Sequence, residues 1–267
     1  MTTQTSKGTA LITGASTGIG AVYADRLARR GYDLILVARN QEKLSQLARE
    51  LAASTGRKIE IIKADLSVKD DLRIIEQRLA NDVGITMLVN NAGLGATKSL
   101  IDSTPEELDD LITLNVQALT RLTRAVAPAM VERNRGTIIN ISSIVALAPE
   151  MLNGTYGGTK AYVLALTQSL DHELTEKGVR VQAVLPGAIS TPFWARAGLP
   201  VQHLPNEIVM TAEDLVDAAL AGLDQGELVT LPSLPDLQEW RRFDDARKAL
   251  KPNLSLVKPA ARYHIGV

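Results

Sequence analysis

Short apolar runs alternate along this chain with longer stretches of helical spacing, and this alternation restricts the fold more than any other feature. The apolar runs predict strands at 9–13, 33–38, 58–64, 87–89, 137–141, 179–185 and 228–231. Helical spacing continues through residue 30 and recurs at 42–54, 69–82, 105–133, 156–176 and 212–223. Strands that are apolar on both faces belong in a parallel sheet covered by helices on both sides. We therefore expect one α/β domain over residues 1–267, with a doubly wound Rossmann fold.

Two segments interrupt this alternation. Residues 192–210 lie between a strand and a helix, a position typical of a lid over a functional site, although an ordinary packing excursion would look the same. Residues 232–267 form a C-terminal extension with a mixed-charge helix candidate around Trp240. Ligands in doubly wound sheets bind at the carboxyl ends of the strands, so the residues after each strand are the candidates for function.

Composition excludes several classes of function. Lys plus Arg is 29 and Asp plus Glu is 30, so a formal net charge of −1 provides no field to attract nucleic acid or an anionic membrane. The absence of cysteine excludes disulfides and thiol nucleophiles, and the three histidines are too scattered to predict a metal site. No apolar run approaches the ~20 residues of a membrane span, and the polar N-terminus does not resemble a signal peptide. We expect a soluble cytoplasmic protein.

A glycine-rich turn, Thr-Gly-Ala-Ser-Thr-Gly-Ile-Gly at 13–20, joins the first strand to the first helix. Gly14, Gly18 and Gly20 would allow a tight turn, expose backbone to a pyrophosphate and let the helix start close to the sheet. A purely structural turn is the alternative. The position between first strand and first helix favours a dinucleotide site.

The second strand ends in Ala38-Arg39, without the acidic residue that usually binds the ribose hydroxyls of NAD. A guanidinium binds a 2′-phosphate through paired hydrogen bonds, so Arg39 predicts NADP(H) in preference to NAD(H), unless it is only a surface arginine. Asp65, at the end of the third strand, would either bind the adenine amino group or cap the next helix.

Tyr156 and Lys160 are four residues apart, which places them on one face of a helix. An ammonium beside a phenol favours the phenolate, so we expect Lys160 to lower the pKa of Tyr156 and make it a proton donor and acceptor. Ser142 and Ser143 end the fifth strand, where a hydroxyl would hold a carbonyl oxygen or only complete a turn. Asn115 lies in a helical run and would organise water or bond a neighbouring backbone group.

Together, the glycine turn, Asn-Asn-Ala-Gly at 90–93, Asn115, Ser142-Ser143, Tyr156-x-x-x-Lys160 and Pro186-Gly187 resemble the classical short-chain dehydrogenase/reductase family over residues 7–231. The resemblance implies a seven-stranded parallel Rossmann sheet with helices on both faces. It also implies an NADP(H)-dependent oxidoreductase that transfers hydride between nicotinamide and a ketone, aldehyde or secondary alcohol. Family members commonly form homodimers or homotetramers, so we expect a homo-oligomer.

The resemblance assigns roles to individual residues. It implies that Tyr156 is the acid/base, that Lys160 lowers its pKa and holds the nicotinamide ribose, and that Asn115 holds a water in a proton relay. Ser143 matches the catalytic serine because it precedes Tyr156 by thirteen positions. The cofactor-binding residues implied are Gly14, Ser16, Thr17, Gly18, Ile19, Gly20, Arg39, Asp65, Leu66, Asn91, Ala92, Gly93, Tyr156, Lys160, Pro186, Gly187, Ile189 and Thr191.

The substrate side is predicted to be apolar, which favours an aliphatic, steroid-like, aromatic or acyl-chain carbonyl compound. The side chains proposed to line it are Val145, Leu152, Phe193 and Trp194, together with Leu147 and Leu199. His203 in the lid would contact substrate or lie on the surface. One rival interpretation is a non-catalytic NADP(H)-binding sensor or scaffold; a methyltransferase is disfavoured by the Tyr–Lys pair and the Asn-Asn-Ala-Gly segment.

Overall fold

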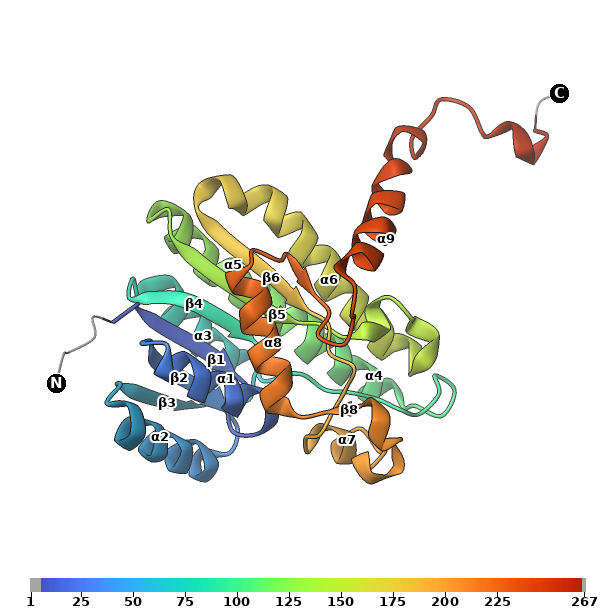
Figure 1. Ribbon diagram of the computed structural model, residues 1–267. Coiled ribbons are helices and arrows are strands. Elements are labelled where there is room, and N and C mark those ends of the chain that lie inside the picture. The colour runs from blue at the N-terminus through green and yellow to red at the C-terminus, as the bar shows by residue number, and fades with distance from the viewer. Residues whose placement is uncertain (1–5, 266–267) are drawn as a thin grey trace. The chain divides into compact units, whose positions relative to one another are not determined.

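Seven parallel strands form the main sheet of the computed structural model, which describes residues 6–265. Their order is β3-β2-β1-β4-β5-β6-β9 (Figure 1). The strands are β1 Thr9–Thr13, β2 Asp33–Ala38, β3 Ile59–Lys63, β4 Ile85–Asn90, β5 Gly136–Ile141, β6 Val179–Val184 and β9 Val229–Thr230. A separate parallel pair joins β7 Ala188–Ile189 to β8 Val209–Met210. The predicted seven-stranded doubly wound fold is confirmed.

Each predicted helix is present, with bounds that shift by a few residues. The helices are α1 Gly18–Arg29, α2 Gln41–Thr55, α3 Lys69–Asn81, α4 Pro105–Ile112, α5 Leu119–Glu132, α6 Gly154–Leu174, α7 Phe193–Arg196, α8 Ala212–Asp224 and α9 Leu237–Ala249. The long run predicted at 105–133 consists of α4, a π-helical turn at Thr113–Ala118 and α5.

The central strands bury side chains on both faces of the sheet, which explains their nearly continuous apolar sequence. In β1, Ala10 and Ile12 belong to the core under α1, α2 and α8, whereas Leu11 belongs to the core under α3 and α5. Figure 1 shows these two helical layers on opposite sides of the sheet. Full burial of a Leu or Ile side chain contributes about 1.5–3 kcal/mol, so both layers stabilise the sheet.

The strand order reverses at β1, which pairs with β2 on one side and β4 on the other. The connections after β1 and β4 therefore diverge at the carboxyl edge of the sheet, which leaves a crevice there in folds of this kind. Both the glycine turn and the Asn-Asn-Ala-Gly segment start at this edge.

The chain divides after Pro232 into two compact units. The second unit contains α9, with the predicted mixed-charge helix around Trp240, and two short 3₁₀ turns at Lys251–Asn253 and Ala261–Tyr263. No residue between 233 and 265 is buried. The prediction of a single domain over 1–267 stays a prediction, and the polar residues 1–5 lie outside the described residues. None of the helices that residues 6–265 form is both long enough and apolar enough to cross a membrane.

Candidate active site

The glycine turn after β1 has the backbone geometry that a bound dinucleotide needs. Gly14 and Gly18 adopt φ values of +65° and +56°, in the left-handed region that favours glycine. A Cβ on Gly20 would collide with the carbonyl oxygen of Gly14. Helix α1 then begins after Thr17, whose side chain makes no capping hydrogen bond, so the amides of the first turn are available to a phosphate. The turn therefore fits a pyrophosphate.

The segment after β4 is fixed against this turn by Thr13 and Asn91. The Thr13 hydroxyl accepts hydrogen bonds from the backbone N–H groups of Asn91 and Ala92, both at 3.0 Å. The Asn91 side-chain amide donates to the carbonyls of Thr13 (2.9 Å) and Gly14 (3.2 Å). Asn91 thus supports the crevice from behind. Thr13 was not among the predicted site residues, although its position at a strand end is the signal that identified the others.

Arg39 extends from the end of β2 with 62% of its side chain exposed. Its nearest carboxylate is that of Asp65, at 3.8 Å between Nη1 and Oδ2. The other Asp65 oxygen accepts from the backbone N–H of Ser67 at 3.0 Å, which closes a local turn. Helix α3 begins after Val68 without a side-chain cap, so the expected capping of this helix by Asp65 is wrong, and the adenine contact stays a prediction. Leu66 is buried in the core. A guanidinium with one distant partner leaves its donors accessible to a phosphate.

The segment after β6 lies across the glycine turn. A Cβ on Gly18 would lie 3.0 Å from the Thr191 side chain, so the two residues are in close contact. Ile189 is buried, and the Pro186 carbonyl accepts a hydrogen bond from the Ile144 N–H at 3.0 Å. The segments that follow β1, β5 and β6 are thereby brought together at the carboxyl edge of the sheet.

Helix α6 carries Tyr156 and Lys160, and both side chains are buried, at 5% and 7% exposure. The Lys160 ammonium lies 5.8 Å from the centre of the Tyr156 ring. It donates a hydrogen bond to the Ile141 carbonyl at the end of β5, at 2.9 Å. Ser143 lies close enough to the Tyr156 phenol to lower its pKa. The structure therefore brings the predicted Tyr–Lys–Ser group together.

The expected lowering of the Tyr156 pKa is wrong for the protein in this state. Burial raises the pKa of Tyr156 to about 12, against the smaller opposing effect of the Ser143 hydrogen bond. Burial also lowers the pKa of Lys160 to about 8. The sequence spacing predicted proximity correctly, but the loss of hydration on burial sets the direction of both pKa shifts.

Ser142 and Ser143 have different roles despite being neighbours. The Ser142 hydroxyl donates to the Lys160 carbonyl at 2.7 Å and so ties β5 to α6. The Ser143 hydroxyl makes only long contacts with backbone, to the Pro186 carbonyl and the Val145 N–H, both at 3.4 Å. Ser143 is therefore the serine that can exchange its weak contacts for a substrate oxygen.

Asn115 lies in the π-helical turn and holds the loop after Gly93. Its Oδ1 accepts from the Leu94 N–H at 2.8 Å, and its Nδ2 donates to the Leu94 carbonyl at 2.9 Å and to Thr159 Oγ1 at 3.1 Å. The expected bond to neighbouring backbone is present, and the role of Asn115 in organising water stays a prediction. A Cβ on Gly93 would lie 3.1 Å from Asn115 Oδ1 and 3.6 Å from Lys160 Nζ, so Gly93 is at the centre of this group.

Apolar side chains surround Tyr156 on the remaining side. Val145, Leu152 and Phe193, which were predicted to line the substrate site, belong to this cluster. The sequence did not identify the other members, Leu94, Ala96, Leu108 and Leu111. Trp194 packs edge-on against Phe193, with ring centres 5.8 Å apart, and donates its indole N–H to the Ile189 carbonyl at 3.0 Å. Leu147 and Leu199 make local backbone hydrogen bonds to Ile144 and Trp194, and His203 is exposed.

Asn153 is a buried residue of the site that the sequence analysis missed. Its Oδ1 accepts from the N–H groups of Thr155 (2.9 Å) and Tyr156 (3.1 Å), which caps α6 at the tyrosine itself. Its Nδ2 donates to the Lys98 carbonyl at 2.7 Å. Asparagine is a preferred capping residue, and its place just before Gly154-Thr155 was the available signal.

The arrangement combines a proton donor, a second hydroxyl and an apolar wall, which suits reduction of a carbonyl group beside a dinucleotide. No group of three or more acidic or histidine side chains within residues 6–265 is placed to hold a metal ion.

Known proteins resemble this chain in sequence and in structure. A family model described as short chain dehydrogenase matches residues 8–200. A short-chain dehydrogenase from Sphingobium yanoikuyae, solved with NADPH, is 48% identical and superimposes with a TM-score of 0.92 over 95% of this chain and 98% of its own. A bulky-bulky ketone specific alcohol dehydrogenase from Comamonas testosteroni is 44% identical, with a TM-score of 0.90 over 97% of this chain and 99% of its own. The 17-beta-hydroxysteroid dehydrogenase type 3 of Danio rerio is 35% identical over 225 residues, 82% of this chain and 70% of the relative.

Proposed function

Because the chain belongs to the short-chain dehydrogenase family, we propose that it reduces ketones carrying two bulky apolar groups, or oxidises the corresponding secondary alcohols, with NADP(H) as hydride carrier. The observation that carries this proposal is the buried Tyr156–Ser143 pair beside Lys160, with an apolar wall facing it. The ketone and steroid substrates named for its relatives are compatible with that wall.

In this mechanism the protein provides the proton and the electrostatic support. NADPH, when bound, supplies the hydride that adds to the carbonyl carbon. Ser143 donates a hydrogen bond to the carbonyl oxygen as its negative charge develops, and Tyr156 transfers its phenolic proton to that oxygen to complete the alcohol. Lys160 is protonated below its pKa of about 8, and its positive charge then stabilises the tyrosinate that remains.

The residues that would hold the cofactor follow the carboxyl ends of β1, β2, β4 and β6 or lie on α6. The glycine turn would bind the pyrophosphate, and Gly93, Lys160 and Thr191 would border the nicotinamide riboside. Of the remaining predicted contacts, Ser16, Thr17, Ala92, Pro186 and Gly187 are in the loops after β1, β4 and β6, and Ile19 is in the first turn of α1. Both N–H donors of the Asn115 side-chain amide are engaged, with the Leu94 carbonyl and Thr159 Oγ1. Asn115 would therefore take part in the proton relay through its backbone groups.

Substitution of the proposed acid tests the mechanism. Tyr156→Phe removes the proton donor but keeps the ring, so turnover of a bulky ketone should fall by a factor on the order of 10³ or more. NADPH affinity, measured by cofactor fluorescence, should stay close to that of the wild type. Phe in place of the exposed Tyr263 is the matched control and should leave both unchanged. A fully active Tyr156→Phe enzyme would exclude this mechanism, and wild-type protein that binds NADPH but turns over no ketone would favour a sensor or scaffold.

The preference for NADP(H) rests on Arg39 and is tested separately. Charge-assisted hydrogen bonds to a 2′-phosphate contribute about 2 kcal/mol, so Arg39→Ala should weaken NADPH binding roughly thirtyfold and leave NADH binding almost unchanged. Arg29→Ala is the control, because it removes a similarly exposed arginine at the C-terminal end of α1, away from the glycine turn. Equal affinity of the wild type for NADH and NADPH would contradict the proposal. The cytoplasmic location of the protein and its assembly as a homodimer or homotetramer stay predictions.

A further inference from the structure

The Phe193 ring belongs to the apolar cluster around Tyr156 and packs against the loop after β4. Its centre lies 6.1 Å from that of Tyr156, with the two rings tilted by 48°. A Cβ built on Gly95 would overlap the far edge of the Phe193 ring. The ring can therefore adopt this position only because residue 95 has no side chain.

The backbone on either side of this contact is held in place. Behind the ring, Trp194 is buried and its indole N–H is bonded to Ile189, while Thr97 Oγ1 donates to the Ala197 carbonyl at 2.7 Å. These bonds fix the start of segment 192–210, the expected lid.

The loop that carries Gly95 is held at both ends as well. Asn115 binds both backbone groups of Leu94, and Asn153 binds the carbonyl of Lys98. Both asparagines are buried, at 2% and 3% exposure. The Phe193 ring is thus the part of this contact that moves most easily, because it can rotate about its side-chain bonds while the backbone on both sides is held.

We propose that Phe193, in contact with Gly95, determines the size of the group that the site accepts beside the carbonyl carbon. This inference rests on the proposed ketone reduction at Tyr156. A ketone whose oxygen meets Tyr156 and Ser143 must place its two substituents along the apolar wall, where the ring lies. A methyl substituent fits beside the ring, whereas a cyclohexyl substituent displaces it from Gly95.

A double-mutant cycle tests the contact. The readout is the ratio of kcat/KM for dicyclohexyl ketone to that for acetone, with NADPH. Phe193→Ala should raise this ratio by about tenfold or more, because the ring no longer occupies the wall. Gly95→Ala should change the ratio about fivefold in the wild-type background, since the new methyl group displaces the ring, but less than about twofold when Phe193 is already alanine. The matched control is Phe243→Ala, which alters the only other phenylalanine, an exposed residue of α9.

A fluorescence measurement follows the ring without turnover. The chain has two tryptophans, and Trp240→Phe leaves Trp194, which packs against Phe193, as the single reporter. With NADP⁺ in place of NADPH no reduction takes place, and dicyclohexyl ketone should change the Trp194 emission while acetone should not. The same titration of the Phe193→Ala variant should give little change.

These results distinguish the specificity role of Phe193 from the proposed ketone reduction. A ratio unaffected by Phe193→Ala, or a Gly95→Ala effect that persists in the absence of Phe193, would overturn the specificity role even if ketones are reduced. Loss of all ketone turnover in the wild type would instead refute the proposed function.

Discussion

Burial opposes the charged forms of Tyr156 and Lys160, the two central residues of the site. The phenol is favoured at neutral pH because the pKa of Tyr156 is raised to about 12, and this is the form that gives a proton to a carbonyl oxygen. Oxidation of an alcohol needs the phenolate instead. Proton donation and proton acceptance by one residue therefore have opposite pH dependences, which favours reduction at neutral pH.

The buried lysine gives stability a characteristic pH dependence. The pKa of Lys160 is about 8 in the folded chain, below its ordinary range, so the folded protein releases this proton before the unfolded chain does. The unfolded state binds more protons between about pH 8 and pH 10, and the free energy of unfolding should rise with pH across this window. Above pH 10 the raised pKa of Tyr156 has the reverse effect, because the folded state then retains the extra proton.

Denaturant unfolding of the wild type and Lys160→Met measures this effect. The difference in unfolding free energy, wild type minus variant, should increase by on the order of 2–3 kcal/mol between pH 7 and pH 10. Lys258→Met removes an exposed lysine and serves as the control. A difference that is independent of pH would show that Lys160 is hydrated and charged throughout.

At the scale of elements, Asn153 connects α6 to the loop that lines the substrate site. Asn153→Asp keeps the oxygen that caps α6 but loses the N–H groups that bind Lys98 and Ser103. Without these bonds the loop moves relative to Tyr156, so we expect kcat to fall by about tenfold while the KM for NADPH stays near its wild-type value. Steady-state kinetics with varied cofactor separate the two parameters.

A purely structural role for Asn153 makes a different prediction. Thr211→Ala removes the capping hydroxyl of α8, which accepts from Asp214 N–H at 3.0 Å, and should cost about 1 kcal/mol of stability without altering kcat. If Asn153→Asp lowers only stability, as this control does, Asn153 does not position the tyrosine.

The alternation of elements was predictable because each central strand is buried on both faces and each helix has an apolar side. The start of α6 and the π-helical turn were less predictable. Gly154 and Thr155 are weak helix formers, so the helix is started by the Asn153 cap and not by propensity. The π-helical turn leaves no periodic signal, and it contains Asn115, whose partners are Leu94 and Thr159.

The site was predictable to the extent that it follows strand ends. Gly14, Asn91 and Ser143 were found in this way, and Tyr156 and Lys160 by their spacing. The pKa of Tyr156 and the contact of Gly95 with Phe193 depend on distant segments packing together, so no local pattern in the sequence indicates them.

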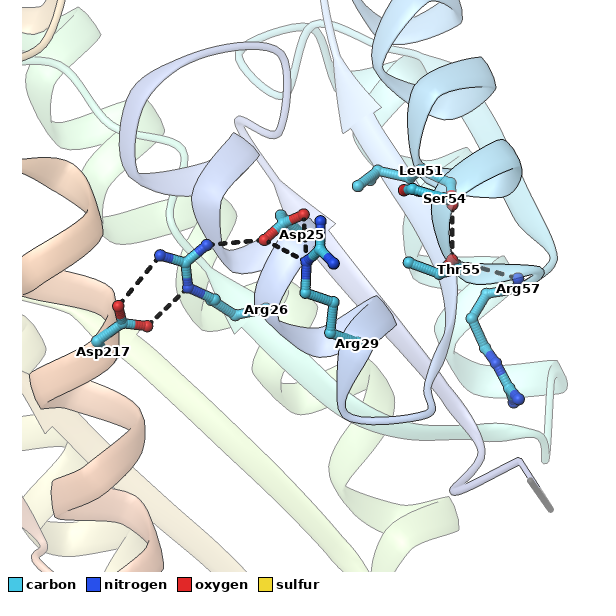
Figure 2. Close-up of polar contacts among 8 residues, drawn as sticks. All are labelled: Asp25, Arg26, Arg29, Leu51, Ser54, Thr55, Arg57 and Asp217. Atoms are coloured by element: carbon cyan, nitrogen blue, oxygen red, sulfur yellow. Dashed lines mark hydrogen bonds and ion pairs between the residues drawn. The ribbon is translucent and has the colours of Figure 1, made fainter. Parts of the chain in front are cut away.

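At the scale of the whole molecule, ion pairs join α1 to α8, two of the helices that cover the same face of the sheet. Figure 2 shows the Arg26 guanidinium of α1 between Asp217 of α8 and Asp25 of its own helix. Arg26 binds both Asp217 oxygens, at 2.7 and 3.1 Å. A second pair, Arg30 with Asp224, lies further along the same two helices. Because these partners are more than 190 positions apart in the chain, the pairs fix helices that only the completed fold brings together.

Removal of this contact should weaken the fold by a small, salt-dependent amount. The Arg26 hydrogen bond lowers the pKa of Asp217, so the carboxylate stabilises the folded state above its ordinary pKa and loses that effect as the pH falls through the lowered value. Since 55% of the Asp217 side chain is exposed, solvent screening limits the contribution, and Asp217→Asn should cost at most about 1 kcal/mol at pH 7. Urea unfolding in low salt and in 1 M NaCl should show the cost shrinking at high salt. Asp70→Asn, which breaks a pair with Arg73 within α3 alone, should have no measurable effect. A cost of the same size in both salt concentrations would mean that Asp217 acts through packing, and that α1 and α8 are held together by their apolar faces alone.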